Sequence, residues 1–251
     1  MKRLLDVVVS MVGLAVASVV LVPAMVAIWM QDRRSPLYMA ARAGIGSKPF
    51  RMVKLRSMRI LSDATGVMST AGDDPRITAV GRFVRRWKLD ELTQLWNVLK
   101  GEMSLVGPRP QVLQDVDLYT NEERRLLSVR PGITDLASIV FADEGDILRG
   151  ATDPDLRYQQ LIRPWKSRLA LLYVDRGRVV TVDLRLLWLT VLNALSRPRA
   201  LAGVAALVTR LGGGAELTRL SLRNANLTPA PPPGATEVFS GRARFARVGP
   251  Q

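Results

Sequence analysis

The sequence predicts a mostly α-helical, monotopic membrane protein with a small β-hairpin element and an N-terminal re-entrant hydrophobic helix. Three observations predict this class: an apolar run over residues 7–30, glycines and a proline between two short apolar runs within residues 35–58, and leucines at helical spacing in residues 89–99. With 251 residues, 48% of them hydrophobic, the chain can bury a sizeable core. We divide it into a membrane-embedded segment 1–34, a catalytic domain 35–199 and a C-terminal extension 200–251.

The composition excludes several kinds of chemistry. Cysteine and histidine are both absent, which rules out disulfides, thiolate nucleophiles and imidazole acid–base catalysis. Any catalysis must therefore use carboxylates, lysine, arginine, hydroxyls or an oxygen-bound metal. The formal net charge of +14 favours a polyanionic partner, which could be nucleic acid, an anionic membrane surface or a phosphorylated substrate.

The apolar run over residues 7–30 has membrane length, because about 20 apolar helical residues cross the hydrocarbon core. Lys2-Arg3 precedes it and Arg33-Arg34 follows it, so residues that favour the cytoplasmic side flank both ends. Pro23 is expected to kink the helix. A helix that breaks near Pro23 and returns to the same face satisfies both observations. A single-span anchor and a cleaved signal peptide are the alternatives.

Residues 35–58 are expected to form the hairpin, with strands near residues 37–39 and 50–55. Its basic side chains include Arg42, Lys54 and Arg56. A solvated basic face is one interpretation of these three side chains, and contact with phosphate is the other.

Leucines 89, 92, 95 and 99 predict one helix that ends at Lys100-Gly101. Asp90, Gln94 and Asn97 fall at i, i+4 and i+7, so we expect them on one face of this helix, with the two amides supporting the site. Glu91 is offset from Asp90 by about 100° around the helix axis. The two carboxylates therefore have different roles: one could attack while the other orients or holds a metal.

Arg109 lies between Pro108 and Pro110, and the two prolines stiffen its backbone. A guanidinium held in this way loses little entropy when it contacts a phosphate through two parallel hydrogen bonds. A plain proline-rich turn is the alternative.

The run L-D-E-L-x-Q-L-x-N-V-L-K-G-x-M-S-x-V-G-P-R-P at residues 89–110 resembles the signature of bacterial sugar transferases, the monotopic polyprenyl-phosphate phosphoglycosyl transferases. The resemblance continues through D-D-P-R-I-T at residues 73–78 and R-P-G-I-T at residues 130–134, and covers roughly residues 1–195. It implies an enzyme that transfers a sugar 1-phosphate from a nucleotide sugar to polyprenyl (undecaprenyl) phosphate. This reaction is the first membrane step of exopolysaccharide, O-antigen or glycoconjugate biosynthesis.

The resemblance also implies the site. Asp90 is the implied nucleophile, which forms an aspartyl-phosphosugar intermediate, and Glu91 is its partner. Arg85 and Arg109 are implied phosphate contacts, and Mg²⁺ is the implied cofactor, with Asp90 and Glu91 as its ligands. The implied location is the bacterial inner membrane with the catalytic domain on the cytoplasmic face.

Membrane lipid and downstream glycosyltransferases are further expected partners, and nucleic acid is not. A catalytically inactive membrane scaffold is one alternative function, although such a scaffold would not need both Asp90 and Glu91. A basic nucleic-acid-binding membrane protein is another, although it would not need the long apolar N-terminus.

Four places depart from the family's usual pattern. Val22-Pro23 stands where a Ser-Pro pair is usual, Thr93 stands where proline is common, and Ala40 stands where glutamine is usual. The segment 135–138 reads D-L-A-S, whereas the motif G-W/L-A-Q often follows P-G-I-T in the family. The last departure bears on the choice of sugar.

The C-terminal part offers weaker signals. Leu184–Leu195 is apolar nearly all round, so it is either buried or lies in the membrane interface. A second apolar stretch, Ala200–Val208, precedes a glycine- and proline-rich tail. We expect this extension to be largely disordered after residue 211.

Overall fold

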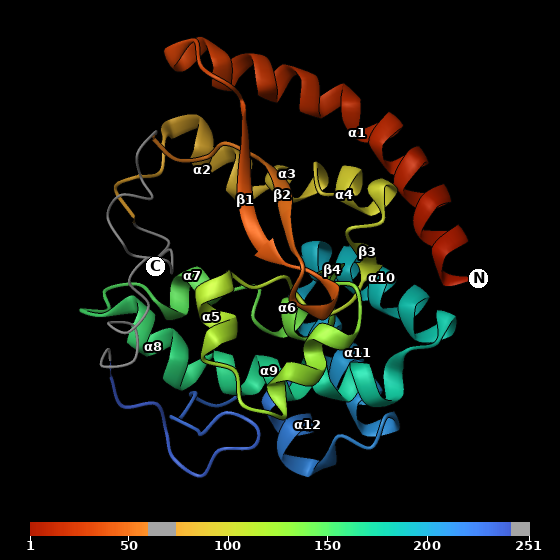
Figure 1. Ribbon diagram of the computed structural model, residues 1–251, viewed down its shortest axis with the longest axis vertical. Helices are drawn as coiled ribbons and strands as arrows, with labels where there is room; N and C mark the ends of the chain where they lie inside the picture. Colours follow the sequence, from red (N-terminus) through yellow and green to blue (C-terminus); the bar gives the residue numbers. More distant parts are fainter. Residues whose placement is uncertain (60–73, 242–251) are drawn as a thin grey trace.

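The computed structural model describes residues 1–59 and 74–241. A long helix, α1 (Lys2–Asp32), leads into an antiparallel hairpin of β1 (Leu37–Ala43) and β2 (Pro49–Leu55), and short helices build most of the remainder (Figure 1). Leu37 pairs with Leu55 at the open end of the hairpin, and Ala43 pairs with Pro49 at its turn. The mostly α-helical class and the predicted hairpin are confirmed.

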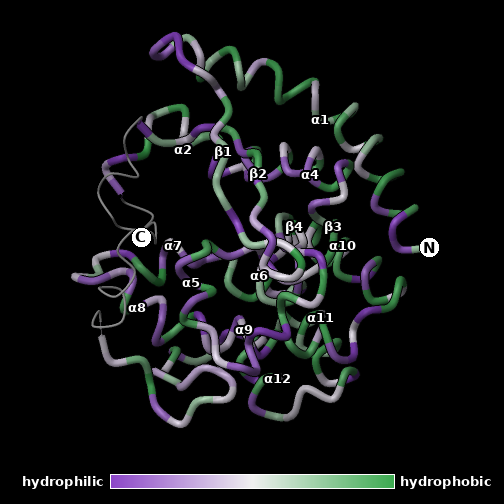
Figure 2. Tube along the Cα trace, in the orientation of Figure 1, coloured by the Kyte–Doolittle hydropathy of each residue, from purple (hydrophilic) through white to green (hydrophobic). Residues whose placement is uncertain are grey.

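Helix α1 is continuous across Pro23, so the expected break at this residue is wrong. Proline removes one backbone donor, but packing on both sides of it holds the helix to the domain. Leu21 and Ile28 are buried in an apolar cluster with Leu55 of the hairpin. The helix follows one edge of the domain (Figure 1) and is apolar over most of its length (Figure 2).

Both ends of α1 are attached to the same domain. At the N-terminal end, the ammonium of Lys2 lies 2.6 Å from a carboxylate oxygen of Asp183. At the other end, Arg56 pairs with Asp32 at 2.6 Å. A 31-residue helix is about 46 Å long, so α1 extends along the domain between these two contacts. It is also the only helix in the described residues that is long and apolar enough to cross a membrane.

The predicted single helix over residues 89–100 is two helices, α3 (Leu89–Leu92) and α4 (Leu95–Lys100), which follow α2 (Ala79–Arg86). Between them, the amide of Gln94 donates to the carbonyl of Glu91, three residues back, at 3.1 Å. The hydroxyl of Thr93 lies 3.0 Å from the carbonyl oxygens of both Asp90 and Val53. This contact with β2 tightens the turn and interrupts the helix. Gly101, with φ of 81°, ends α4 as predicted.

A second sheet was not predicted. Strand β3 (Ser104–Val106) pairs in parallel with β4 (Gly132–Thr134). A Cβ at Gly132 would lie 2.1 Å from the amide nitrogen of Gly107, so only glycine allows this close approach of the two backbones.

Short helices follow in the chain, and most of them form the main core together with this second sheet. Their bounds are α5 (Leu113–Asp117), α6 (Leu136–Val140), α7 (Glu144–Ile147), α8 (Pro154–Leu161) and α9 (Arg163–Leu172).

Helix α10 (Val180–Leu195) has two apolar faces in different surroundings. Leu186 and Leu189 are buried in the core, whereas Trp188 and Leu195 are exposed, at 62% and 78%. One face is therefore buried, and the other is available for the membrane interface.

The expected disorder after residue 211 is wrong for the part of the extension that the structure describes. After α11 (Arg197–Arg210), the chain forms α12 (Gly214–Leu222) and an irregular segment to residue 241. Leu217 and Ala230 are buried in the main core, and the amide of Ala230 donates to the carbonyl of Gln160 at 3.1 Å. These contacts supply the apolar burial that composition alone did not reveal.

Candidate functional site

A cleft of about 740 Å³ opens between the hairpin with α2 and α3 on one side and the segments from α5 to α9 on the other. Six side chains singled out from the sequence line it: Arg42, Lys54, Arg85, Asp90, Glu91 and Arg109. They come from β1, β2, α2, α3 and the loop after β3, so the tertiary structure brings together residues that are up to 67 positions apart, from 42 to 109. Further basic residues on the cleft wall are Arg82, Arg86, Lys88, Arg149 and Lys166. The cleft is thus suited to an anionic ligand.

Asp90 is a buried carboxylate without a hydrogen-bond partner. Its exposure is 9%, and within the described residues no hydrogen bond or ion pair reaches its carboxyl oxygens. Burial raises the pKa of Asp90, and the positive charge of Lys54 opposes that change. Buried carboxylates are normally paired, so this one is free to react with or to bind a ligand in the cleft.

Glu91 has the opposite environment. Its carboxylate accepts a hydrogen bond from the guanidinium of Arg109 at 2.7 Å. Burial would raise the pKa of Glu91, but the positive charges of Arg109, Lys88 and Lys54 outweigh it and lower that pKa to about 2. The adjacent carboxylates therefore differ sharply: Glu91 is committed to an ion pair and Asp90 is not.

Two cations beside Asp90 are themselves partly desolvated. Burial and the charge of Arg109 lower the pKa of Lys54 to about 8. Burial also lowers the pKa of Arg85, and one of its guanidinium nitrogens, Nη1, is buried with no hydrogen-bond partner in the described part of the chain. An anionic ligand that contacts both cations would restore their lost solvation.

Of the polar residues predicted for the site, Arg56, Gln94 and Asn97 do not line the cleft. Arg56 pairs with Asp32 of α1, so the expectation that it contacts phosphate is not supported. Gln94 is buried with 1% exposure, and the break before α4 removes it from the expected common face with Asp90.

Asn97 supports the site indirectly. It donates from Nδ2 to the carbonyl of Arg51 at 2.8 Å and accepts at Oδ1 from the amide of Val53 at 2.9 Å. It therefore fixes the strand that carries Lys54.

Sequence reasoning missed the far wall of the cleft. Lys166 of α9 forms an ion pair with Glu144 of α7, and Asp115 of α5 has a pKa raised to about 6 by burial. These residues are ordinary charged positions in the sequence, and no local pattern sets them apart. Only the packing of their helices brings them opposite Asp90.

The donor set fits Mg²⁺ only in part. No group of three or more acidic side chains suited to a metal occurs among residues 1–59 and 74–241. Mg²⁺ often takes only one or two protein carboxylates and completes its shell with water and substrate phosphates. The open carboxylate of Asp90 fits that role, whereas Glu91 is held by Arg109.

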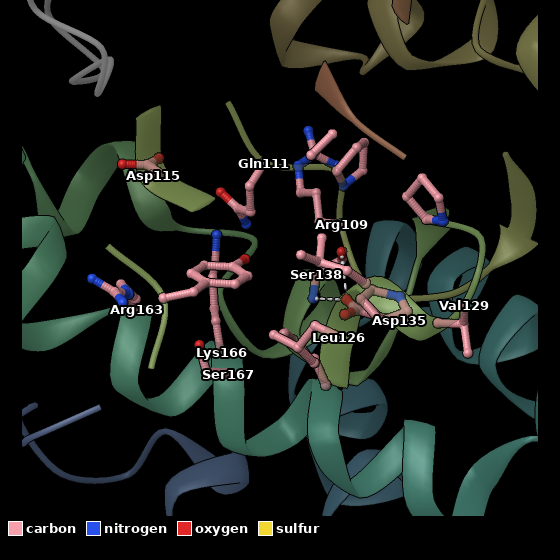
Figure 3. A pocket seen from close by; sticks show the side chains of 18 of the residues that line it. Arg109, Gln111, Asp115, Leu126, Val129, Asp135, Ser138, Arg163, Lys166 and Ser167 are labelled. Atoms are coloured by element: carbon pink, nitrogen blue, oxygen red, sulfur yellow. Dashed lines mark hydrogen bonds between the residues drawn. The ribbon is translucent and has the colours of Figure 1, made fainter. Parts of the chain in front are cut away.

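A smaller pocket of about 40 Å³ opens beside the cleft and shares Arg109, Ser138 and Lys166 with it. Figure 3 shows these side chains together with Asp135, whose Oδ1 accepts hydrogen bonds from the amide and the hydroxyl of Ser138 at 2.6 and 2.7 Å.

A family model described as bacterial sugar transferase matches residues 1–197. The chain belongs to the bacterial sugar transferase family. The match covers the cleft and ends at the start of α11, so α12 and the segment after it lie outside the shared part of the family.

Several curated relatives are similar over most of this range. A UDP-glucose:undecaprenyl-phosphate glucose-1-phosphate transferase of Caulobacter vibrioides is 36% identical over 173 residues, which are 66% of this chain and 65% of the relative. An undecaprenyl-phosphate galactose phosphotransferase of Salmonella typhimurium is 40% identical over 164 residues, 58% of this chain and 34% of the relative. The chain thus spans between one third and two thirds of the length of these relatives.

Proposed function

We propose that this bacterial sugar transferase moves a sugar 1-phosphate from a nucleotide sugar to undecaprenyl phosphate, with Asp90 as the nucleophile. The observation that carries the proposal is the unpaired, buried Asp90 carboxylate in a cleft lined by cations. The names of the relatives, which act on undecaprenyl phosphate, supply the substrate class.

In the first step, a carboxylate oxygen of Asp90 attacks the phosphorus that bears the sugar. The phosphoanhydride bond breaks, the nucleoside monophosphate leaves, and the phosphosugar stays on Asp90 as an acyl phosphate. In the second step, an oxygen of undecaprenyl phosphate attacks the same phosphorus and releases Asp90. Both nucleophiles are anions at neutral pH, so neither step needs a histidine base.

The surrounding cations stabilise the charge that these steps bring together. Phosphoryl transfer depends mainly on positioning and charge neutralisation. Arg85 has a buried Nη1 without a partner, and Lys54 lies on the same wall of the cleft, so both are placed to contact the diphosphate. Glu91 holds the guanidinium of Arg109 in place. Mg²⁺ bound to Asp90 and to the substrate would supply further neutralisation of the diphosphate.

The apolar surface supports action at a membrane. The outer face of α1 exposes many apolar side chains, and Trp87, Trp96 and Trp188 are each more than half exposed, which suits the water–lipid interface. Placement at the bacterial inner membrane, with the catalytic domain on the cytoplasmic face and downstream glycosyltransferases as partners, is part of this proposal. The polyanion that explains the positive charge is then the substrate and the lipid surface rather than nucleic acid.

Intact-protein mass spectrometry tests the covalent step. Wild-type enzyme with a nucleotide sugar and Mg²⁺, but without lipid acceptor, should release at most one equivalent of nucleoside monophosphate and gain the mass of one phosphosugar. Asp90→Asn keeps the shape and removes the nucleophile, so both signals should disappear, and turnover should fall by at least about 10³-fold.

Glu91→Gln is the companion variant. It weakens the hold on Arg109 but leaves Asp90 intact, so turnover should slow severely while traces of the adduct remain. An unmodified wild type under confirmed turnover, with nucleotide release strictly dependent on the lipid, would instead indicate direct transfer and leave Asp90 only the role of a metal ligand.

A further inference from the structure

The small pocket beside the cleft contains a buried acceptor that the proposed chemistry does not use. Asp135 is 1% exposed and lines this pocket together with Arg109 and Ser138. Its Oδ1 accepts both hydrogen bonds from Ser138, whereas its Oδ2 is buried and has no partner among the residues that the structure describes. A buried acceptor that is left unpaired is destabilising, so the free oxygen needs an explanation.

Helix capping explains only half of this carboxylate. Asp135 is the N-cap of α6, and a cap needs one oxygen to accept from the amide three residues ahead. Serine, threonine or asparagine would serve equally well. Burial also raises the pKa of Asp135, and the hydrogen bonds from Ser138, which lower that pKa, offset only part of the rise. A carboxylate here is thus a costly choice for a cap.

The size of the pocket limits what can reach Oδ2. A volume of about 40 Å³ holds about three water molecules. A nucleobase or a whole sugar ring is too large, but a hydroxyl, a hydroxymethyl or the end of an acetamido group can enter.

The position of the pocket identifies the part of the donor that lies there. Arg109 lines both the pocket and the cleft and pairs with Glu91, the neighbour of Asp90. In the proposed reaction the sugar is attached through one oxygen to the phosphorus that Asp90 attacks. The sugar is therefore bound directly to the reacting phosphorus, close enough for a ring substituent to extend toward this end of the cleft.

We propose that Asp135 selects the sugar: its Oδ2 accepts a hydrogen bond from an O–H or N–H on a ring substituent that enters this pocket. This inference rests on the proposed function.

The test keeps the nucleotide constant and varies the sugar. UDP-glucose, UDP-galactose, UDP-N-acetylglucosamine and UDP-N-acetylgalactosamine differ only at C2 and C4, and UMP release with undecaprenyl phosphate gives kcat/KM for each. Asp135→Ser keeps a capping oxygen and removes Oδ2. Asp135→Asn keeps the shape and replaces one acceptor with a donor. Asp153→Ser is the matched control, because Asp153 caps α8 through the amide of Leu156 at 3.0 Å and does not line the pocket.

In both Asp135 variants, the kcat/KM ratio between the preferred sugar and its C2 or C4 counterpart should fall at least tenfold. Their thermal midpoints should change less than the midpoint of an Asp135→Ala variant, which loses the cap. The Asp153→Ser enzyme should keep the wild-type ratios. Ratios that stay within twofold of wild type, or an equal loss for all four sugars, would show that Asp135 is a cap alone and overturn the inference while the proposed function stands. A wild type that releases nucleoside monophosphate from none of the four, and from no GDP- or dTDP-linked sugar either, would overturn both.

Discussion

Lys54 illustrates how one side chain can set the working pH of the site. Burial and the neighbouring charge of Arg109 bring its pKa to about 8, whereas an exposed lysine titrates near 10.4. Its positive charge, which opposes the rise in the pKa of Asp90, is therefore present below pH 8 and lost above it.

We predict that kcat/KM declines as the pH rises through about 8, approaching a tenfold loss per pH unit. Lys54→Arg should keep the charge and remove this alkaline limb, because arginine stays protonated far above this range. Rate profiles of both enzymes between about pH 6.5 and pH 9.5 decide the matter. If kcat/KM of Lys54→Arg declined over the same alkaline pH range as the wild type, the titration would belong to another group.

Among the elements, α1 has the most consequence for function. Lys2 at one end and Asp32 at the other are each tied to the domain, and Arg3 donates to the carbonyls of Val98 and Leu99. Such a helix could cross the membrane only if contacts at one end were given up. Attachment at both ends, rather than a break at Pro23, is thus our reason to expect the topology inferred from the flanking charges.

We predict that both ends of α1 face the cytoplasm. The chain contains no cysteine, so one cysteine can be appended before Met1 and another can replace the exposed Lys48 in the hairpin turn. In intact cells neither should react with a membrane-impermeant thiol reagent, and both should react after permeabilisation. Labelling of either site from outside would establish a spanning helix.

At the scale of the whole molecule, the C-terminal extension completes the core. Two carbonyls of the segment after α12 accept hydrogen bonds from the domain. The guanidinium of Arg168 donates to the carbonyl of Pro231 at 2.9 Å, and the hydroxyl of Thr120 donates to the carbonyl of Pro233 at 2.5 Å. Arg223 also reaches Asp143 on the rim of the cleft at 3.3 Å. The extension is thus packed against the helices that form the far wall of the site.

We predict that ending the chain after Gly213 destabilises the enzyme by several kcal/mol, because it uncovers apolar side chains that α12 and Ala230 now cover. At about 2–4 °C per kcal/mol, the thermal midpoint should drop by about 10 °C. Glu216→Ala, at an exposed position of α12, is the full-length control and should leave the midpoint unchanged. A truncated enzyme with wild-type stability and turnover would show that the extension is dispensable.

Local patterns were enough to identify the apolar helix, the hairpin, the helix stop at Gly101 and the adjacent carboxylates Asp90 and Glu91. Each of these depends on residues within a few positions of one another, through periodicity, turn residues or a continuous motif. The remaining features depend on distant partners. Thr93 interrupts its helix because Val53 offers a carbonyl, and Arg56 leaves the site because Asp32 offers a carboxylate.

The pairing of β3 with β4, the order of the extension and the free oxygen of Asp135 likewise arise from packing between segments far apart in the chain. A side chain's local spacing fixes the face on which it lies, but its burial and charge environment depend on which surfaces meet. That is why the sequence pattern could point to the adjacent carboxylates Asp90 and Glu91 but not to the wall of helices opposite them.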